Sequence, residues 1–557
     1  IRVSAIELGH DAIQPFLLSS APRMPDGYDH LAALSRRRVM PSAACAERQR
    51  CYQHGNDEPT SHCILLLRPP TRNYLRLCRA KTSAILSAEV DGMGLSRREF
   101  MGYIGKSALG LALASRANAQ QPPREMDKMG KTSTESVNSI LDREVQRTKP
   151  DYIVYRPGSL DGSTFDTGNE HFLVFDGPDG SLMAVWTQSS YEGAGDHRIV
   201  FSRSDDDGVT WSPPLRLVGP AKPGDGHMAS WGFPMVTKSG RIYVIYNQYQ
   251  GIDDVVHQHT GTMDCVYSDD TGKTWSKPQT IPMKRSIYDH PDPKVPSCWI
   301  VWQKPILDLK GNYFTGYSHW VSRAVWHAPH VNSWTAWETV VEFMRFENLH
   351  DNPEPRDIRI TWSRGENALR VPHYSNPILS VAQEPSIVRL PDKRLFCVMR
   401  TMSGYIWYSL SDDDGASWCC PRPLLRKDFG VPILQPLCCC PIYEYPDGRY
   451  VLLHHNNNGR IDGSPPENTK INRRPAFIAV GEYRPKAEQP IWFSESKQLM
   501  DNDGVGIGPL DRLECGVYPS VTYRKGNFVL WHPDRKFFLV GKKITPEWLA
   551  DLSVPES

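Results

Sequence analysis

A polar turn flanked by two apolar runs recurs six times after residue 170, at intervals of about 55 to 80 residues. The glycine and asparagine in these turns tolerate the positive φ that short β-turns require, so each unit predicts a β-hairpin. The turns are Pro178-Asp179-Gly180, Lys238-Ser239-Gly240, Lys310-Gly311-Asn312, Pro391-Asp392-Lys393, Pro446-Asp447-Gly448 and Lys525-Gly526-Asn527. Six such hairpins indicate an all-β chain folded as a six-bladed β-propeller, with about four strands in each blade.

A second repeated element supports this fold. It reads SDDDGVTW at 204–211, SDDTGKTW at 268–275 and SDDDGASW at 411–418, which all fit Ser-x-Asp-x-Gly-x-(Thr/Ser)-Trp. The Asp can accept hydrogen bonds from its own turn, the Gly permits the bend, and the Trp can pack beside the blade. The element lacks the spaced ligands and terminal Glu of a calcium loop, so we interpret it as structural.

These three Asp boxes, in register with the six hairpins, resemble the sialidase (neuraminidase) superfamily over roughly residues 165–545. The resemblance implies a sialidase-like six-bladed propeller. After Tyr518 the last blade shows only three strands, SVTY, NFVLWHP and KFFLVGKKI. The segment DYIVY at 151–155 is therefore expected to supply the fourth strand, so that an N-terminal strand closes the ring.

Hairpins and Asp boxes mark one face of an up-and-down propeller, so the other strand ends meet on the opposite face, where loops can build a pocket. The polar residues expected on that face are Glu170, His171, Glu192, Asp196, Glu384, Arg400, Arg473 and Tyr518. Glu384 opens one strand and Arg400 ends its hairpin partner, almost opposite each other. We expect these two side chains to touch or to share a ligand.

The resemblance assigns roles to several of these residues. Tyr518, in CGVYPSV, is similar to the segment that carries the nucleophilic tyrosine of sialidases, and Glu384 stands where the family has the glutamate that activates it. A neutral tyrosine suits a substrate with a carboxylate on the anomeric carbon, since an anionic nucleophile would be repelled there. Arg400 and Arg473 resemble two of the three arginines that clamp that carboxylate.

The acid/base residue is expected in the loop after the second strand of the first blade, where Glu192 stands and Asp196 is the reserve. The chain departs from the family at the start of that blade, where sialidases have an Arg-Ile-Pro motif. Here Glu170 and His171 replace the arginine and are expected to contact the substrate. Losing one arm of the clamp should weaken carboxylate binding by roughly 2 to 4 kcal/mol, which indicates a different sugar as the substrate.

An export signal is predicted inside the chain. Arg97-Arg98, the apolar stretch IGKSALGLALA and Ala117-Asn118-Ala119 resemble a twin-arginine signal over 93–119. We expect residues 1–92 to be a leader absent from the mature protein, 120–150 a linker, 151–548 the propeller and 549–557 a tail. This organisation predicts a periplasmic or secreted protein with no membrane anchor after signal cleavage.

Charge and cysteine content exclude several classes. The 64 Lys and Arg balance 63 Asp and Glu, which gives a net charge of +1 and no indication of a nucleic-acid partner. The 13 cysteines are irregularly spaced without a CxxC pair, so no zinc site is predicted. We expect no metal and no organic cofactor.

The leading hypothesis is an exported, exo-acting glycoside hydrolase of the sialidase superfamily, which releases a terminal acidic sugar from a glycan or glycoconjugate through Tyr518. One alternative is a lyase that cleaves uronic-acid polysaccharides by β-elimination, with Tyr518 and His171 as base and acid. Another is a propeller that binds glycans without catalysis. A lyase product would gain ultraviolet absorbance, whereas binding without any product would favour the third.

Overall fold

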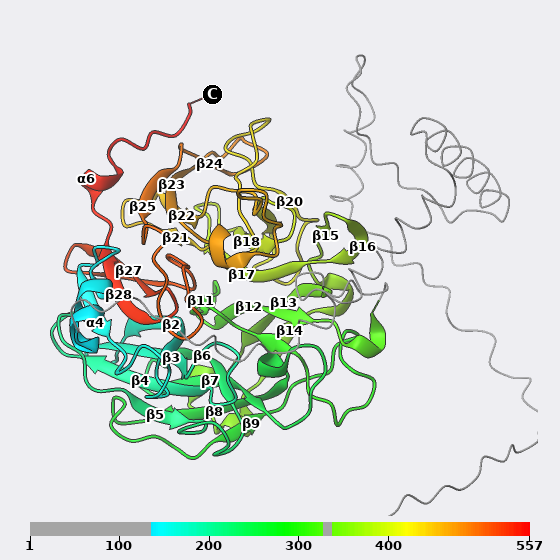
Figure 1. Cartoon of the computed structure of the whole chain (residues 1–557). Coiled ribbons are helices and arrows are strands. Elements are labelled where there is room, and N and C mark those ends of the chain that lie inside the picture. Colours follow the sequence, from blue (N-terminus) through cyan, green and yellow to red (C-terminus); the bar gives the residue numbers. More distant parts are fainter. Residues whose placement is uncertain (1–134, 327–336, 557) are drawn as a thin grey trace, which may run out of the picture. The chain divides into compact units, whose positions relative to one another are not determined.

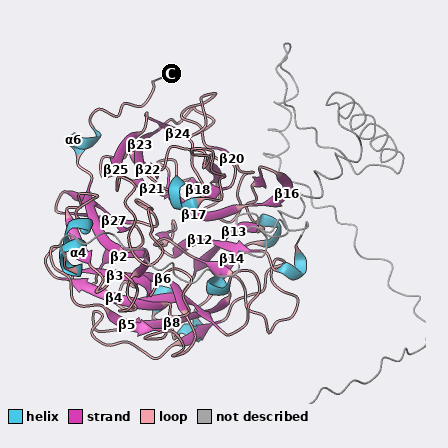
Figure 2. Ribbon diagram, viewed as in Figure 1, coloured by secondary structure: helices cyan, strands magenta, loops and turns pink. Residues whose placement is uncertain are grey.

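The computed structural model describes residues 135–326 and 337–556. In these residues, six sheets of four or five strands follow one another around a ring, each forming one blade (Figure 1). Strands and loops make up almost all of this part of the chain, and its helices are short (Figure 2). The fold is a six-bladed β-propeller, as the hairpin pattern predicts.

The blades take their strands in sequence order. Blade 1 contains β2 (Gly168–Asp176), β3 (Leu182–Ser189), β4 (Arg198–Ser204) and β5 (Leu215–Val218), and blade 2 contains β6 (Ala229–Val236), β7 (Ile242–Tyr249), β8 (Gly261–Ser268) and β9 (Gln279–Ile281). Blade 3 contains β10 (Trp299–Ile300), β11 (Ile306–Leu307), β12 (Tyr313–Trp320), β13 (Thr339–Phe346) and β14 (Ile360–Ser363). The first strand of each blade is the innermost one.

Blade 4 contains β17 (Ala382–Arg389), β18 (Leu395–Thr401), β19 (Trp407–Ser411) and β20 (Arg422–Pro423). Blade 5 contains β21 (Ile442–Glu444), β22 (Tyr450–His454), β23 (Ala476–Tyr483), β24 (Ile491–Phe493) and β25 (Lys497–Met500). Blade 6 contains β26 (Ser520–Arg524), β27 (Asn527–Asp534), β28 (Phe538–Lys543) and β1 (Tyr152–Tyr155). A separate hairpin is formed by β15 (Pro372–His373) and β16 (Asn376–Ser380).

The helices are α4 (Val137–Val145), α5 (Thr469–Asn472) and α6 (Pro546–Leu549), with 3-10 turns at His257–His259, Arg323–Val325, Leu349–Asp351, Pro355–Asp357 and Gly365–Asn367. Within the described ranges, none of them is long and apolar enough to span a bilayer. The predicted signal and leader lie outside these ranges.

The ring closes as predicted. β1 pairs antiparallel with β28, with Tyr152 opposite Gly541, and becomes the outermost strand of blade 6. Tyr152 also packs against Trp531 of the same blade, with ring centroids 5.2 Å apart. The chain thus fastens its last blade with a strand that precedes its first.

Each of the six predicted turns forms the inner hairpin of a blade, and in blade 3 it joins β11 to β12. A glycine adopts positive φ in five of these turns, joined by Lys525 in the last one, and Lys393 does so in the turn without glycine. The Asp boxes join the third and fourth strands. In the first box, Asp206 accepts hydrogen bonds from the backbone N–H and the hydroxyl of Thr210, at 2.8 and 2.6 Å, and Trp211 donates to the carbonyl of Gly208 at 3.0 Å. These turns hold themselves together, as the motif predicts.

One part of the expected linker folds onto the propeller. Helix α4 lies within 120–150, and its buried Leu141 and Val145 pack against Phe537 and Phe538 of blade 6. Its Glu144 also forms an ion pair with the fully buried Arg535, with 3.0 Å between Oε2 of the glutamate and Nη1 of the arginine. The linker expectation is therefore wrong for this stretch, because an apolar helix face and a buried charge both need the propeller to cover them.

The expected tail is also partly folded. Leu549, Leu552 and Val554 are buried in the core cluster that joins blades 5 and 6. Only part of 549–557 is therefore exposed.

The Asp-box glycines allow neighbouring blades to pack closely, which predicts a stability difference. A Cβ on Gly415 (φ +90°) would overlap the ring of Phe314 in blade 3, whereas one on Gly448 (φ +86°) would meet nothing within 4 Å. Both alanine substitutions cost backbone strain, but Gly415→Ala adds overpacking. We expect its free energy of unfolding, measured by denaturant titration, to fall about 1 to 3 kcal/mol further than that of Gly448→Ala. Equal losses would show that this contact contributes nothing.

Candidate active site

The innermost strands of blades 1, 2 and 4 break their register at the same level. The pairing shifts within β2, β6 and β17, and at each shift a residue other than glycine adopts positive φ: His171 (+55°), Trp231 (+58°) and Glu384 (+48°). Tyr518 (+49°) does the same directly before β26. A bulge of this kind re-aims a side chain and stores strain, and both features are enriched at functional sites. These four residues are the first members of the candidate site.

Tyr518, Glu384 and Arg400 form one hydrogen-bonded cluster. The Tyr518 hydroxyl donates to Oε1 of Glu384 at 2.9 Å. Nη1 of Arg400 donates to the same oxygen at 2.5 Å and to the Tyr518 hydroxyl at 3.1 Å. All three are at least 96% buried. The contact that the hairpin register predicts between Glu384 and Arg400 is therefore present, and a tyrosine from 118 positions further along the chain joins it.

Arg473 lies near enough to this cluster for its charge to act on the Tyr518 phenol. It follows α5 and donates to the carbonyl of Leu437 through Nε at 3.1 Å and Nη2 at 2.8 Å. The adjacent Arg474 instead pairs with Asp501 at 2.6 Å, so Arg473 is the arginine that faces the site. Burial raises the pKa of the Tyr518 phenol well above its usual value and the charge of Glu384 adds to this effect, whereas Arg400 and Arg473 oppose it. The phenol is thus protonated at rest and needs a base to become a nucleophile.

Glu192 lies in a second, charged cluster. Lys536 approaches its Oε1 at 2.6 Å, and Arg512 contacts its other oxygen. Although burial opposes ionisation, the charges of Arg512 and Lys536 hold the pKa of Glu192 well below its usual range. A carboxylate held ionised in this way is a poor proton donor, so the geometry does not favour the acid role expected for Glu192.

Glu170 is the better candidate for that role. It is 1% exposed, and burial, followed by the charge of Glu192, raises its pKa to about 8. Its Oε2 lies 3.9 Å from the Lys536 ammonium, which in turn lies 5.1 Å from the centroid of the Tyr518 ring. Two neighbouring carboxyl groups with opposite pKa shifts are typical of an acid and an ionised partner. The sequence reveals Glu170 only as a substrate contact.

Asp196 anchors a loop. Both of its oxygens accept from the backbone N–H of Ser190 at 3.1 Å, and Oδ2 accepts from the Ser190 hydroxyl at 2.7 Å. It is fully buried, and the guanidinium of Arg198 lies 3.9 Å away. These bonds pin both ends of the loop between β3 and β4 and leave Asp196 unsuited to the reserve acid role.

Aromatic rings form a wall beside Tyr518. Trp231 lies 5.6 Å and Trp302 6.1 Å from the Tyr518 ring, and Trp231 also contacts His171 at 5.1 Å and His259 at 5.4 Å, measured between centroids. Burial lowers the pKa of His171 to about 3, so its imidazole is neutral. Neither of its ring nitrogens has a hydrogen-bond partner in the described part of the chain. Such a wall suits the apolar face of a sugar ring.

Sequence reasoning missed Trp231, Lys536 and Arg512. Lys536 follows Asp534 and Arg535 at the end of β27, and Arg512 lies in a loop. No motif or hydrophobic periodicity marks either position in the sequence. The residues next to Trp231 in the sequence give no signal that it adopts positive φ. Within the described residues, no group of three or more His, Cys, Asp or Glu side chains is arranged to hold a metal ion.

This fold and site define a propeller whose inner strand ends carry a buried cluster of tyrosine, glutamate and arginine. The chain belongs to the BNR repeat-like domain family, whose model matches residues 180–527. No curated protein matches the chain.

Several solved structures are similar to the chain at low identity. A Hadza microbial sialidase shares 15% identity with a TM-score of 0.47 over 69% of this chain, which spans 66% of that sialidase's length. The intramolecular trans-sialidase from Ruminococcus gnavus shares 15% with a TM-score of 0.46, over 71% of this chain and 97% of its own. The NanB sialidase from Streptococcus pneumoniae shares 13% with a TM-score of 0.47, over 74% and 73%.

The buried charge pair predicts a specific stability effect. Glu384→Ala leaves Arg400 buried without its carboxylate, and we expect the free energy of unfolding to fall by about 3 to 5 kcal/mol. Glu384→Gln keeps a hydrogen-bond acceptor and should lose less. Denaturant titration of both variants measures the difference. Equal stability of Glu384→Ala and wild type would contradict the buried pair.

Proposed function

We propose that this protein is an exported, exo-acting glycoside hydrolase that releases a terminal acidic sugar through a covalent intermediate on Tyr518. The observation that carries the proposal is the hydrogen bond from the Tyr518 hydroxyl to Glu384, with the Arg400 guanidinium 3.1 Å from the same hydroxyl. A nucleophile, its base and a stabilising cation are thus in contact.

The reaction takes two steps. The Tyr518 oxygen attacks the anomeric carbon while its proton passes to Glu384, and the departing glycosidic oxygen takes a proton from Glu170. Water then attacks the same carbon and gives a proton to the Glu170 carboxylate, as the bond to Tyr518 breaks and the phenol recovers its proton from Glu384. Both glutamates return to their starting state.

Arg400 and Arg473 would hold the sugar's acidic group, because a guanidinium presents several N–H donors in one plane. Lys536 would supply a third positive charge where Glu170 and His171 replace the arginine of the sialidase motif. This assignment rests on its position between Glu170 and the ring of Tyr518. An ammonium already paired with Glu192 attracts a carboxylate less strongly than a free arginine, which favours an acidic sugar other than the usual sialic acid.

Tyr518→Phe tests the nucleophile. It removes the hydroxyl but keeps the ring against Trp231, so we expect folding to persist while turnover of a fluorogenic acidic glycoside falls below about one thousandth of wild type. Tyr523→Phe, on an exposed strand position, is the matched control and should keep full turnover. Unchanged hydrolysis in Tyr518→Phe would remove the mechanism. Circular dichroism checks that both variants fold.

The raised pKa of Glu170 predicts the alkaline limb of the pH profile. Because Glu170 must be protonated to act as the acid, kcat/KM should fall as pH rises through about 8. Glu170→Gln should abolish this limb and lower kcat/KM by about 10²- to 10⁴-fold for a sugar leaving group. Glu192→Gln should keep the limb but move it to lower pH, since a neighbouring negative charge is gone. An unaltered alkaline limb in Glu170→Gln would exclude this residue as the acid.

The lyase alternative is less favoured by the site. It needs His171 as an acid, yet burial keeps that imidazole neutral at physiological pH. A product whose new double bond absorbs in the ultraviolet would nevertheless identify the protein as a lyase. Binding of a glycan without any product would identify it as a glycan-binding propeller.

A further inference from the structure

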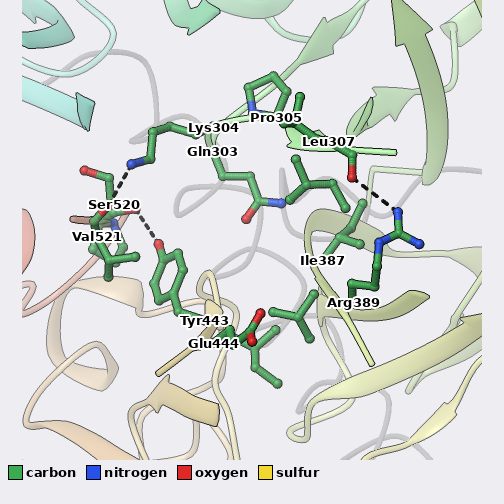
Figure 3. Close-up of a pocket in the computed structure, with 14 residues that line it drawn as sticks. Gln303, Lys304, Pro305, Leu307, Ile387, Arg389, Tyr443, Glu444, Ser520 and Val521 are labelled. Carbon is green, nitrogen blue, oxygen red and sulfur yellow. Dashed lines mark hydrogen bonds between the residues drawn. The ribbon is translucent and has the colours of Figure 1, made fainter. Parts of the chain in front are cut away.

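A cavity of about 290 Å³ lies at the other end of the innermost strands. Its walls come from blades 3 to 6, and β17, β21 and β26 contribute residues nearer to their hairpin turns than Glu384 and Tyr518 are (Figure 3). The residues that line it are Gln303, Lys304, Pro305, Ile306, Leu307, Ile387, Val388, Arg389, Ile442, Tyr443, Glu444, Pro519, Ser520 and Val521. None of the proposed catalytic residues is among them, so this is a separate site.

The polar end of the cavity comes from a break in blade 3. Its innermost strand is interrupted between β10 and β11, and residues 301–305 carry no ladder hydrogen bonds. Pro305 has no N–H to donate, which is consistent with this interruption. Gln303 and Lys304 therefore leave the sheet and line the cavity.

Lys304 is a half-buried cation with an incomplete set of partners. Its Nζ donates to the carbonyl of Val521 at 2.6 Å, which uses one of three N–H bonds. No carboxylate of the described residues lies within ion-pair distance of it. Burial lowers the pKa of Lys304 to about 8, and the charge of Asp176, which is not within ion-pair distance, opposes this effect. Most of the ammonium is therefore charged at neutral pH.

Gln303 is the second polar group of the cavity. The residue is 6% exposed, and its side chain contributes to the lining of the cavity. Figure 3 shows this amide pointing into the middle of the cavity, toward the region between Ile387 and Glu444. An amide that faces the cavity can both donate a hydrogen bond to a ligand and accept one from it.

We propose that this cavity binds a small organic carboxylate with an apolar body. The carboxylate would accept hydrogen bonds from the Lys304 ammonium and the Gln303 amide, and the apolar part would lie against Ile387, Ile442 and Val521. The exposed carboxylate of Glu444 at the rim would repel a second negative charge. The site therefore favours monoanions over dianions of similar size, and it does not depend on the proposed hydrolysis.

Ligand-detected NMR and calorimetry on the full chain test this proposal with butyrate, benzoate, glucuronate and the dianion succinate. Butyrate or benzoate should bind at pH 7 more tightly than succinate, and the affinity should fall as pH rises from 7 to 9, because Lys304 loses its proton. If glucuronate binds with the same pH dependence, the ligand is a sugar acid. If only benzoate or butyrate binds, the ligand is an apolar acid. Both results support the site.

Lys304→Met should weaken this binding at least about tenfold, the effect of a lost charge-assisted hydrogen bond. Lys310→Met removes an exposed lysine of the nearby hairpin turn and should change nothing. Gln303→Leu, which removes no charge, gives a second variant should Lys304→Met fold poorly, and it should also weaken binding. Absence of binding by all three monoanions at millimolar concentration, or equal affinity in wild type and both cavity variants, would overturn the proposal.

Discussion

The pairing of β1 with β28 is the contact on which the rest of the molecule depends. Blade 6 has only three strands of its own after Tyr518, so an open ring would leave the edge of β28 exposed and blade 6 free to move away from blade 1. The site spans that seam, since Glu170 and Glu192 belong to blade 1 while Lys536 and Tyr518 belong to blade 6. The strand pairing that closes the ring therefore also brings the residues of the site together.

Charges inside this ring stay buried because they are paired, and the pairing sets their chemistry. An isolated carboxylate at these depths would take up a proton, whereas Arg512 and Lys536 keep Glu192 ionised. The same negative charge then raises the pKa of its neighbour Glu170. In this cluster Glu192 is thus an anion and Glu170 an acid, although their side chains are identical. The difference arises because Glu192 is in direct contact with two cations.

Sequence patterns predict the parts of this protein that obey local rules. The six hairpins and three Asp boxes follow from turn chemistry, and the contact between Glu384 and Arg400 follows from counting outward from Asp392-Lys393 in one hairpin. The partners of Glu192 lie 320 and 344 positions away in segments without periodicity, so no local rule could assign them. Helix α4 is missed for a related reason: its short apolar stripe has meaning only against Phe537 and Phe538.

The bulges explain how one set of strands can serve two sites. Within the bulge of β17, Glu384 is directed to the cluster with Tyr518, and after the bulge Ile387 lines the cavity near the hairpin turns. A regular strand alternates its side chains between two faces with a fixed period, so one extra residue changes which side chains reach the axis on either side of it. The strain of positive φ at Glu384 and Tyr518 is thus tied to the geometry of both ends, and any change that relaxed it would alter the cluster and the cavity together.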